Sequence, residues 1–150
     1  MVDKQTETIK LPCPAEQLLP HRPPMLLIDS LLQREKDTAI ASATLTQDNI
    51  FYSNEHGLVE EYFIELVAQT MAAANGFDAL LEHGPVKDGF IVGIETFSLH
   101  QTQHQQGTFR VVAAKDMEFA QMQVIDGAVF ADSTCIASVR LKLWEDKTSK

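Results

Sequence analysis

The chain has 150 residues, of which 45% are hydrophobic and 22% charged, which is ordinary for a globular protein with one domain over residues 1–150. Its formal net charge of −9 argues against nucleic acid or an anionic membrane as the main partner, because both need basic surface. No apolar run reaches the roughly 18 residues of a membrane span, and the first eight residues lack the apolar segment of a signal peptide. The two cysteines, Cys13 and Cys135, lie far apart, so we expect free thiols and a cytoplasmic location.

The first third of the chain predicts two antiparallel strands after an irregular beginning. Residues 1–10 are polar, and the prolines of Pro20–Pro24 restrict that stretch to an ordered bend. Alternating apolar and small polar residues then favour extended structure. The predicted elements are a helical turn over Ala15–Leu19, strands over Met25–Arg34 and Thr38–Thr46, a turn over Gln33–Asp37 and a loop over 47–58.

The middle of the chain predicts one long helix, and the rest predicts strands. The helix extends from Val59 to Leu81 and is ended by His83-Gly84-Pro85, while Gly76 weakens the prediction for its last turn. Asp126-Gly127, between two strand-like runs, predicts a hairpin turn. The predicted strands cover Gly89–Leu99, Thr108–Glu118, Ala120–Ile125 and Gly127–Leu143, and residues 145–150 are a frayed tail.

This order of elements predicts an α+β fold. One helix cannot cover both faces of a large sheet, so the sheet should be antiparallel, strongly curved and wrapped around the helix. Such a sheet leaves an edge strand exposed, and we therefore expect a dimer that pairs through an edge.

Glu65 is the only charged residue between Tyr62 and Phe77, in a segment that is otherwise apolar, small or neutral. A carboxylate in a buried helix is costly unless it is paired, protonated or used in chemistry. Gln69 lies four residues later on the same helix face, where its amide could orient the carboxyl for general acid catalysis. The alternative is a glutamate satisfied by backbone groups or by an arginine from a strand.

The histidines offer two candidates for chemistry. His21 lies between prolines, which favours a structural hydrogen bond, and His56 lies in a polar loop near the predicted helix start, where it could approach Glu65. His100 and His104 have a spacing that binds a metal only on a helix, and their segment is predicted to be a strand end and loop. No glycine-rich nucleotide loop, nucleophile elbow or zinc spacing is present in the sequence, so we expect no cofactor and no metal.

Two segments resemble the β-hydroxyacyl-acyl-carrier-protein dehydratases of the FabZ and FabA type. They are Leu19–Asp29, which reads Leu-Pro-His-Arg-Pro-Pro-Met-Leu-Leu-Ile-Asp, and Ile64–Gln69, which reads Ile-Glu-Leu-Val-Ala-Gln. The run Val124–Thr134 is also similar, and the stretch from Gly57 to Gln69 looks closest to the ApeP-like branch linked to aryl polyene biosynthesis. The resemblance implies a hot-dog fold, in agreement with a curved sheet around one helix.

The resemblance also implies an activity. In that family a histidine removes the α-proton of a 3-hydroxyacyl thioester and an acidic helix residue protonates the departing hydroxyl, with the two groups coming from opposite subunits. Glu65 matches the acid and Gln69 the glutamine that follows it. The family's Gly-His-Phe-Pro motif stands about fourteen residues before the acid, which is Phe51 here, and the sequence contains no His-Phe-Pro. His56 and His21 are therefore the candidates for the base.

Three functions follow from this comparison. The first is a dehydratase of fatty acid or polyene synthesis, whose substrate is an acyl chain on the phosphopantetheine arm of an acyl carrier protein. The second is a non-catalytic subunit in a heterodimer with a histidine-bearing homologue, and the third is a thioesterase, because fold does not fix function. In each case we expect an apolar tunnel with substrate-binding residues Gln69, Phe63 and Met71, together with Leu66, Ile91 and Val92.

Overall fold

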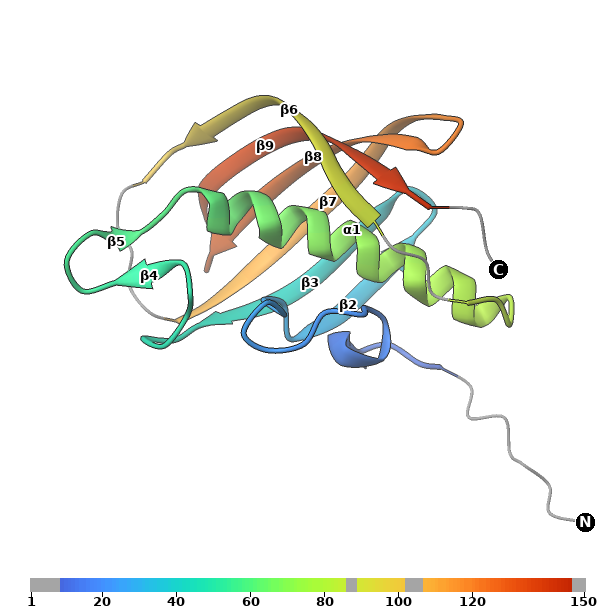
Figure 1. The fold of residues 1–150 in the computed structure, drawn as a ribbon, viewed down its shortest axis with the longest axis horizontal. Helices are drawn as coiled ribbons and strands as arrows, with labels where there is room; N and C mark the ends of the chain where they lie inside the picture. The colour runs from blue at the N-terminus through green and yellow to red at the C-terminus, as the bar shows by residue number, and fades with distance from the viewer. Residues whose placement is uncertain (1–8, 86–88, 102–106, 147–150) are drawn as a thin grey trace, which may run out of the picture.

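The computed structural model describes residues 9–85, 89–101 and 107–146, so most of the predicted loose start and tail lies outside the described residues. The elements in chain order are β1 (Cys13–Pro14), the 3-10 turn η1 (Ala15–Gln17), β2 (Ser30–Glu35), β3 (Thr38–Leu45), β4 (Tyr52–Ser53), β5 (Gly57–Leu58), α1 (Glu61–Leu81), β6 (Gly89–Leu99), β7 (Gly107–Phe119), β8 (Met122–Ala131) and β9 (Thr134–Glu145). Within the described residues, seven strands form an antiparallel sheet in the order β1-β2-β3-β7-β8-β9-β6, and β4 pairs with β5. Figure 1 shows the sheet curving around α1.

The first predicted strand begins later than the sequence pattern indicates, at Ser30 rather than Met25. The backbone around residues 25–27 makes hydrogen bonds to the side chain of Gln69 in α1 instead of to a neighbouring strand. The helical turn at Ala15 and the strand from Thr38 are confirmed, and the proline-rich stretch between them forms no regular element. Residues 25–27, which precede β2, are thus bound to α1 rather than to the sheet.

The long helix is confirmed and runs through Gly76 without a break. A Cβ at this position would lie 2.3 Å from the carbonyl oxygen of Leu18, so the glycine lets the N-terminal turn pack directly on the helix. The helix starts at Glu61, two residues after the predicted start, because Val59 N donates to the carbonyl of Phe51 and closes the small β4–β5 hairpin.

The predicted hairpin turn at Asp126-Gly127 is wrong. Both residues lie inside β8, which pairs with β7 on one side and with β9 on the other. The turns fall at Ala120-Gln121 and Asp132-Ser133, where Ala120 and Asp132 both adopt a φ of 54°. Gly127 is explained by packing instead, since the side chain of Val67 lies directly over it. The other predicted strands, Gly89–Leu99 and Thr108–Glu118, are confirmed within one residue at each end.

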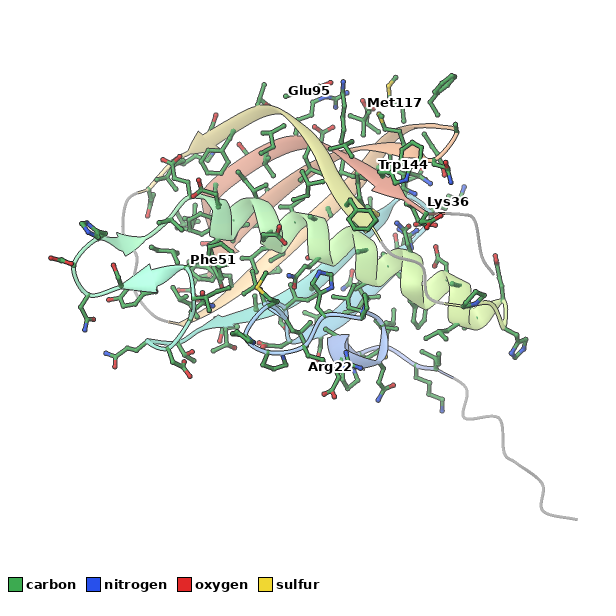
Figure 2. All side chains as sticks on the ribbon, in the orientation of Figure 1. Arg22, Lys36, Phe51, Glu95, Met117 and Trp144 are labelled. Atoms are coloured by element: carbon green, nitrogen blue, oxygen red, sulfur yellow. The ribbon has the colours of Figure 1, made fainter. Side chains whose placement is uncertain are left out.

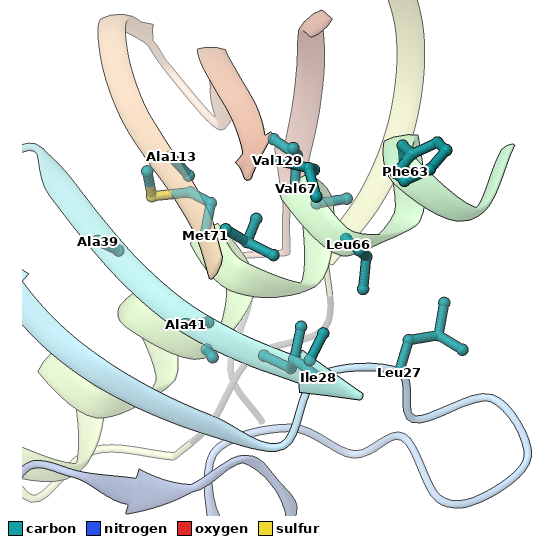
Figure 3. Close-up of a cluster of buried hydrophobic side chains, with 14 of the residues drawn as sticks. Leu27, Ile28, Ala39, Ala41, Phe63, Leu66, Val67, Met71, Ala113 and Val129 are labelled. Carbon is teal, nitrogen blue, oxygen red and sulfur yellow. The ribbon is translucent and has the colours of Figure 1, made fainter. Parts of the chain in front are cut away.

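The core fills the space between α1 and the concave face of the sheet. Thirteen of the 21 residues of α1 are buried, which agrees with the absence of a charged face. Figure 3 shows Val67 and Met71 of the helix directed toward strands that carry Val129 and Ala113. This curved antiparallel sheet around one long helix is a hot-dog fold, as predicted. No helix in the described part of the chain is long and apolar enough to cross a membrane.

Candidate functional site

A cavity of about 570 Å³ opens between α1, the loop after η1 and the beginning of β6. This volume lies within the range of pockets that hold small organic ligands. Its wall combines a few polar side chains with an apolar remainder, which is the usual composition of a ligand site. The lining residues are Pro20, His21, Glu65, Ala68, Gln69, Ala72, Gly89, Phe90, Ile91 and Leu143.

Glu65 is the only carboxylate among these lining residues, and its side chain is half-buried. It makes no hydrogen bond and no ion pair with any residue that the structure describes, so the alternative of a structurally satisfied glutamate finds no support there. The helix places it at the cavity wall because it shares a face with Ala68 and Ala72. A carboxyl group in this position is available to a ligand.

His21 lines the same cavity, although it comes from the loop after η1. Its ring Nδ1 is buried and has no hydrogen-bond partner among the described residues, which is unusual for a buried polar atom. The fold therefore brings a partner-free imidazole nitrogen and a partner-free carboxylate to one cavity. The structural hydrogen bond that the sequence favours for His21 is not found for this atom.

Arg22 fixes the backbone next to His21. Its Nη1 donates to the carbonyl oxygens of Leu19, at 2.9 Å, and of His21, at 2.7 Å. Its Nε lies 3.7 Å from a carboxylate oxygen of Glu16, in a pair whose side chains are largely exposed. Figure 2 shows Arg22 on this loop beside α1. The guanidinium therefore bonds to groups within residues 16–21 and stabilises the loop that carries His21.

Gln69 is 2% exposed and holds the other end of this loop. Its Oε1 accepts from Leu27 N at 2.9 Å, and its Nε2 donates to Met25 O at 2.8 Å. The amide is thus directed to the backbone of the 25–27 stretch and not to Glu65. The predicted orienting contact between Gln69 and Glu65 is not present.

Small residues create the space in the cavity. Ala68 and Ala72 lie on the helix face of Glu65, and Gly89 lies opposite, where a Cβ would be 4.0 Å from that of Ala72. Ile91 and Leu143 supply the apolar wall on the sheet side. The prediction of Ile91 in the cavity wall is confirmed, whereas Ala68 and Ala72 were not predicted, although their spacing of three and seven residues from Glu65 on the same helix face is a usable signal.

The other predicted substrate-binding residues lie elsewhere. Phe63 and Met71 are 1% and 0% exposed and belong to the core, so neither lines the cavity. Phe63 packs edge-on against Tyr62 and Phe109, with ring centroids 5.5 and 6.0 Å apart. Both side chains point toward the sheet because the helix rotates them away from the face that carries Glu65.

The other histidines that the structure describes lie outside the cavity. His56 is on the exposed β4–β5 hairpin with its side chain 79% exposed, and its Nε2 is 3.8 Å from Glu55. The Nε2 of His100 is 3.0 Å from Ser138 Oγ on the sheet surface, and His83 adopts a φ of 58° just after α1. His104 lies outside the described residues. No group of three or more potential metal ligands is found among the residues the structure describes.

The cavity is next to a sheet edge. β6 pairs with β9 on one side only, and its other side has no strand within the described part of the chain. Three large apolar side chains of β6 are about half exposed: Phe90 at 56%, Val92 at 53% and Ile94 at 49%. A long, apolar edge strand of this kind is a site at which another chain can pair.

Comparisons with known proteins agree with this fold. A family model described as "ApeP-like: ApeP dehydratase" matches residues 13–150. The dehydratase heterocomplex ApeI:P from Xenorhabdus doucetiae is similar, with a TM-score of 0.82, 17% identity and coverage of 93% of this chain and 94% of that chain. The conserved protein PA5202 from Pseudomonas aeruginosa has a TM-score of 0.64 at 13% identity, covering 87% of this chain and 98% of that chain. The E. coli PaaI protein has a TM-score of 0.59 at 14% identity, covering 76% and 80%. None of the curated proteins compared with the chain matches it.

Proposed function

The chain belongs to the ApeP-like dehydratase family, and from this premise we propose that it is a subunit of a dehydratase acting on 3-hydroxyacyl thioesters. The substrate is an acyl chain on the phosphopantetheine arm of an acyl carrier protein, in fatty acid or polyene-type synthesis in the cytoplasm. The observation that carries the proposal is that Glu65 and His21 line one cavity, and that neither the carboxylate nor the buried Nδ1 has a partner among the residues the structure describes.

The proposed reaction needs one base and one acid, which these two side chains can supply. A neutral imidazole of His21 takes the proton from the α-carbon, and the electrons of that C–H bond form the new double bond. The bond from the β-carbon to the hydroxyl oxygen breaks as Glu65, as a carboxylic acid, gives that oxygen its proton. The products are an enoyl thioester and one water, and a proton passed from imidazolium to carboxylate restores the starting state.

The partner in this proposal is a second hot-dog subunit at the β6 edge. The exposed side chains of Phe90, Val92 and Ile94 support it, because their burial would favour association, and the edge lies beside the cavity. The similar ApeI:P structure is a heterocomplex, which favours a homologue over a second copy of this chain as the partner. His56 is the alternative base, carried by its exposed hairpin to the cavity of the partner subunit.

Hydration of a crotonyl thioester tests the proposal, because it is the reverse reaction and consumes the enoyl chromophore. The chain is assayed alone and with its co-expressed homologue, as wild type and as Glu65→Gln, His21→Asn and His56→Asn. We expect Glu65→Gln and His21→Asn each to lower turnover by about 100-fold or more, the usual effect of losing a general acid or base. Circular dichroism spectra should stay unchanged, since neither the Glu65 nor the His21 side chain makes a hydrogen bond to another residue that the structure describes.

The same assay decides between the candidate bases and functions. A loss with His56→Asn and none with His21→Asn would assign the base to the β4–β5 hairpin of this chain, acting in the cavity of the partner subunit. Turnover only in the mixture, unaffected by Glu65→Gln in this chain, would favour a non-catalytic subunit. Thioester cleavage without enoyl formation would favour a thioesterase. No turnover of any hydroxyacyl or enoyl thioester by either preparation would overturn the proposal.

A further inference from the structure

The amide of Gln69 takes the place of a neighbouring strand for a stretch of chain that has none. Residues 25 and 27 are two apart, so in an extended chain Met25 O and Leu27 N face the same side. One amide side chain offers one acceptor and a pair of N–H donors, and Gln69 uses Oε1 and Nε2 on these two backbone groups. Buried backbone groups need such partners, and the neighbouring strand β3 provides them from Asp29 onward, whose N donates to Ser42 O at 2.7 Å.

This contact fixes the loop that carries His21. On one side of the histidine, Arg22 bonds the carbonyls of Leu19 and of His21 itself. On the other side, Gln69 bonds the backbone of residues 25 and 27. The ring Nδ1 of His21 has no hydrogen bond among the described residues. The position of the imidazole at the cavity therefore depends on where its backbone is held.

We propose that Gln69 is a positioning residue: it holds the 19–27 loop on α1 and thereby keeps His21 at the cavity wall beside Glu65. The inference rests on the proposed pairing of these two side chains. It replaces the sequence-based role of Gln69 in binding substrate, because the amide already bonds two backbone groups and is 2% exposed. Gln69 and Glu65 belong to the same helix, so the acid and the anchor of the base move together.

Gln69→Glu gives a test with a built-in switch. A neutral carboxyl has one O–H donor and one carbonyl acceptor, so it can make both bonds, whereas a carboxylate cannot donate to Met25 O. Burial disfavours the charged form, so the pKa of the new carboxyl is raised in the folded state. The stabilising bonds are therefore present at low pH and are lost as the pH rises through that value. Gln69→Met is the matching variant whose effect does not depend on pH, because methionine is similar in size to glutamine and makes neither of the two hydrogen bonds.

The readout is NMR of the His21 ring, assigned with His21→Asn. The quantity measured is the change in ring chemical shift caused by Glu65→Gln at a fixed pH. In the wild-type background, Glu65→Gln should change the chemical shift of the His21 ring clearly. In the Gln69→Met background, the same substitution should change it by less than half as much. With Gln69→Glu the change should match wild type at the acid end of the stable range and match Gln69→Met at the alkaline end. Gln33→Glu, on the exposed side of β2, is the control and should behave as wild type throughout.

The outcomes separate this inference from the proposed function. No response of the His21 ring to Glu65→Gln in wild-type protein would overturn the pairing on which both rest. A wild-type response with folded Gln69→Met, or a response with Gln69→Glu that does not depend on pH, would overturn the positioning role alone. If Gln69→Met does not fold, the test rests on the other two variants. The response of the His21 ring to Glu65→Gln should then fall with rising pH in Gln69→Glu and not in Gln33→Glu. Where turnover is measurable, Gln69→Met should lower kcat more than it raises KM.

Discussion

The backbone of Gly127 in β8 lies against the side chain of Val67 in α1, so closely that a Cβ on the glycine would be 2.2 Å from Val67 Cγ1. Valine is short and stiff at χ1, and Val67 is fully buried, so it cannot move aside. The glycine thus sets how closely the helix approaches the middle of the sheet, and through the helix it sets the position of the cavity wall.

Gly127→Ala should lower the free energy of unfolding by about 2 kcal/mol, because the extra methyl overpacks the core. Urea denaturation followed by circular dichroism measures the change. Gly93→Ala in β6 is the matched control, since the nearest atom to its Cβ would be 3.8 Å away in the Lys142 side chain, and it should have little effect. In a Val67→Ala background, Gly127→Ala should lower the free energy of unfolding much less, because the side chain that the new methyl would meet is shortened. Additive costs would contradict it.

Ala72→Leu should fill the cavity while leaving Glu65 and His21 in place. We expect an acyl-pantetheine amide analogue to bind at least 10-fold more weakly, which corresponds to about 1.4 kcal/mol. Longer acyl chains should lose more than short ones, because the added side chain occupies the apolar part of the cavity. Isothermal titration calorimetry measures the affinities. Ala79→Leu, on the same helix and outside the lining, is the control, and equal losses for both variants would show that the analogue binds elsewhere.

Val92→Lys and Ile94→Lys should prevent pairing at the β6 edge. A lysine on an edge strand opposes strand addition because its charge would have to be desolvated. On the chain co-expressed with its homologue, light scattering coupled to size-exclusion chromatography should then give this chain its own mass, 16.7 kDa, instead of that of a dimer. Phe119→Lys is the control, since that side chain is 84% exposed at the end of β7 and away from the edge. A dimer that persists in both β6 variants places the interface elsewhere.

Cys13 and Cys135 should differ in reactivity. Burial raises the pKa of the Cys13 thiol above its usual value, so its thiolate appears only as the pH rises beyond the normal range. Cys135 is only partly buried. In a brief treatment with iodoacetamide near pH 8, we expect Cys135 to be alkylated about 10-fold faster or more, because the thiolate is the reactive form. Mass spectrometry of the peptides measures both rates. In urea the two should be equal, and equal rates in native protein would contradict the prediction.

The sequence was informative wherever a signal is local. The long helix, the η1 turn and the strands β3, β6 and β7 follow from periodicity and from prolines, and they lie within one or two residues of their predicted bounds. The importance of Glu65 follows from its isolation among neutral residues of one helix. There are two exceptions. At Asp126-Gly127 a local turn signal was overruled by packing against Val67. The strand predicted from Met25 begins only at Ser30, because the backbone of residues 25 and 27 bonds Gln69 instead.

The candidate site depends on contacts that no local pattern encodes. His21 and Glu65 meet in one cavity only because the 19–27 loop folds back onto α1, and Gln69 serves that loop rather than its helical neighbour Glu65. Phe63 and Met71 are as apolar as a tunnel wall requires, but the rotation of the helix turns them into the core. By itself the sequence determined the helix, its carboxylate and the curved sheet, because these need only the spacing of residue types. The tertiary structure decided which histidine lines the same cavity as the carboxylate and which small residues leave room there, because both depend on how segments far apart in the chain pack together.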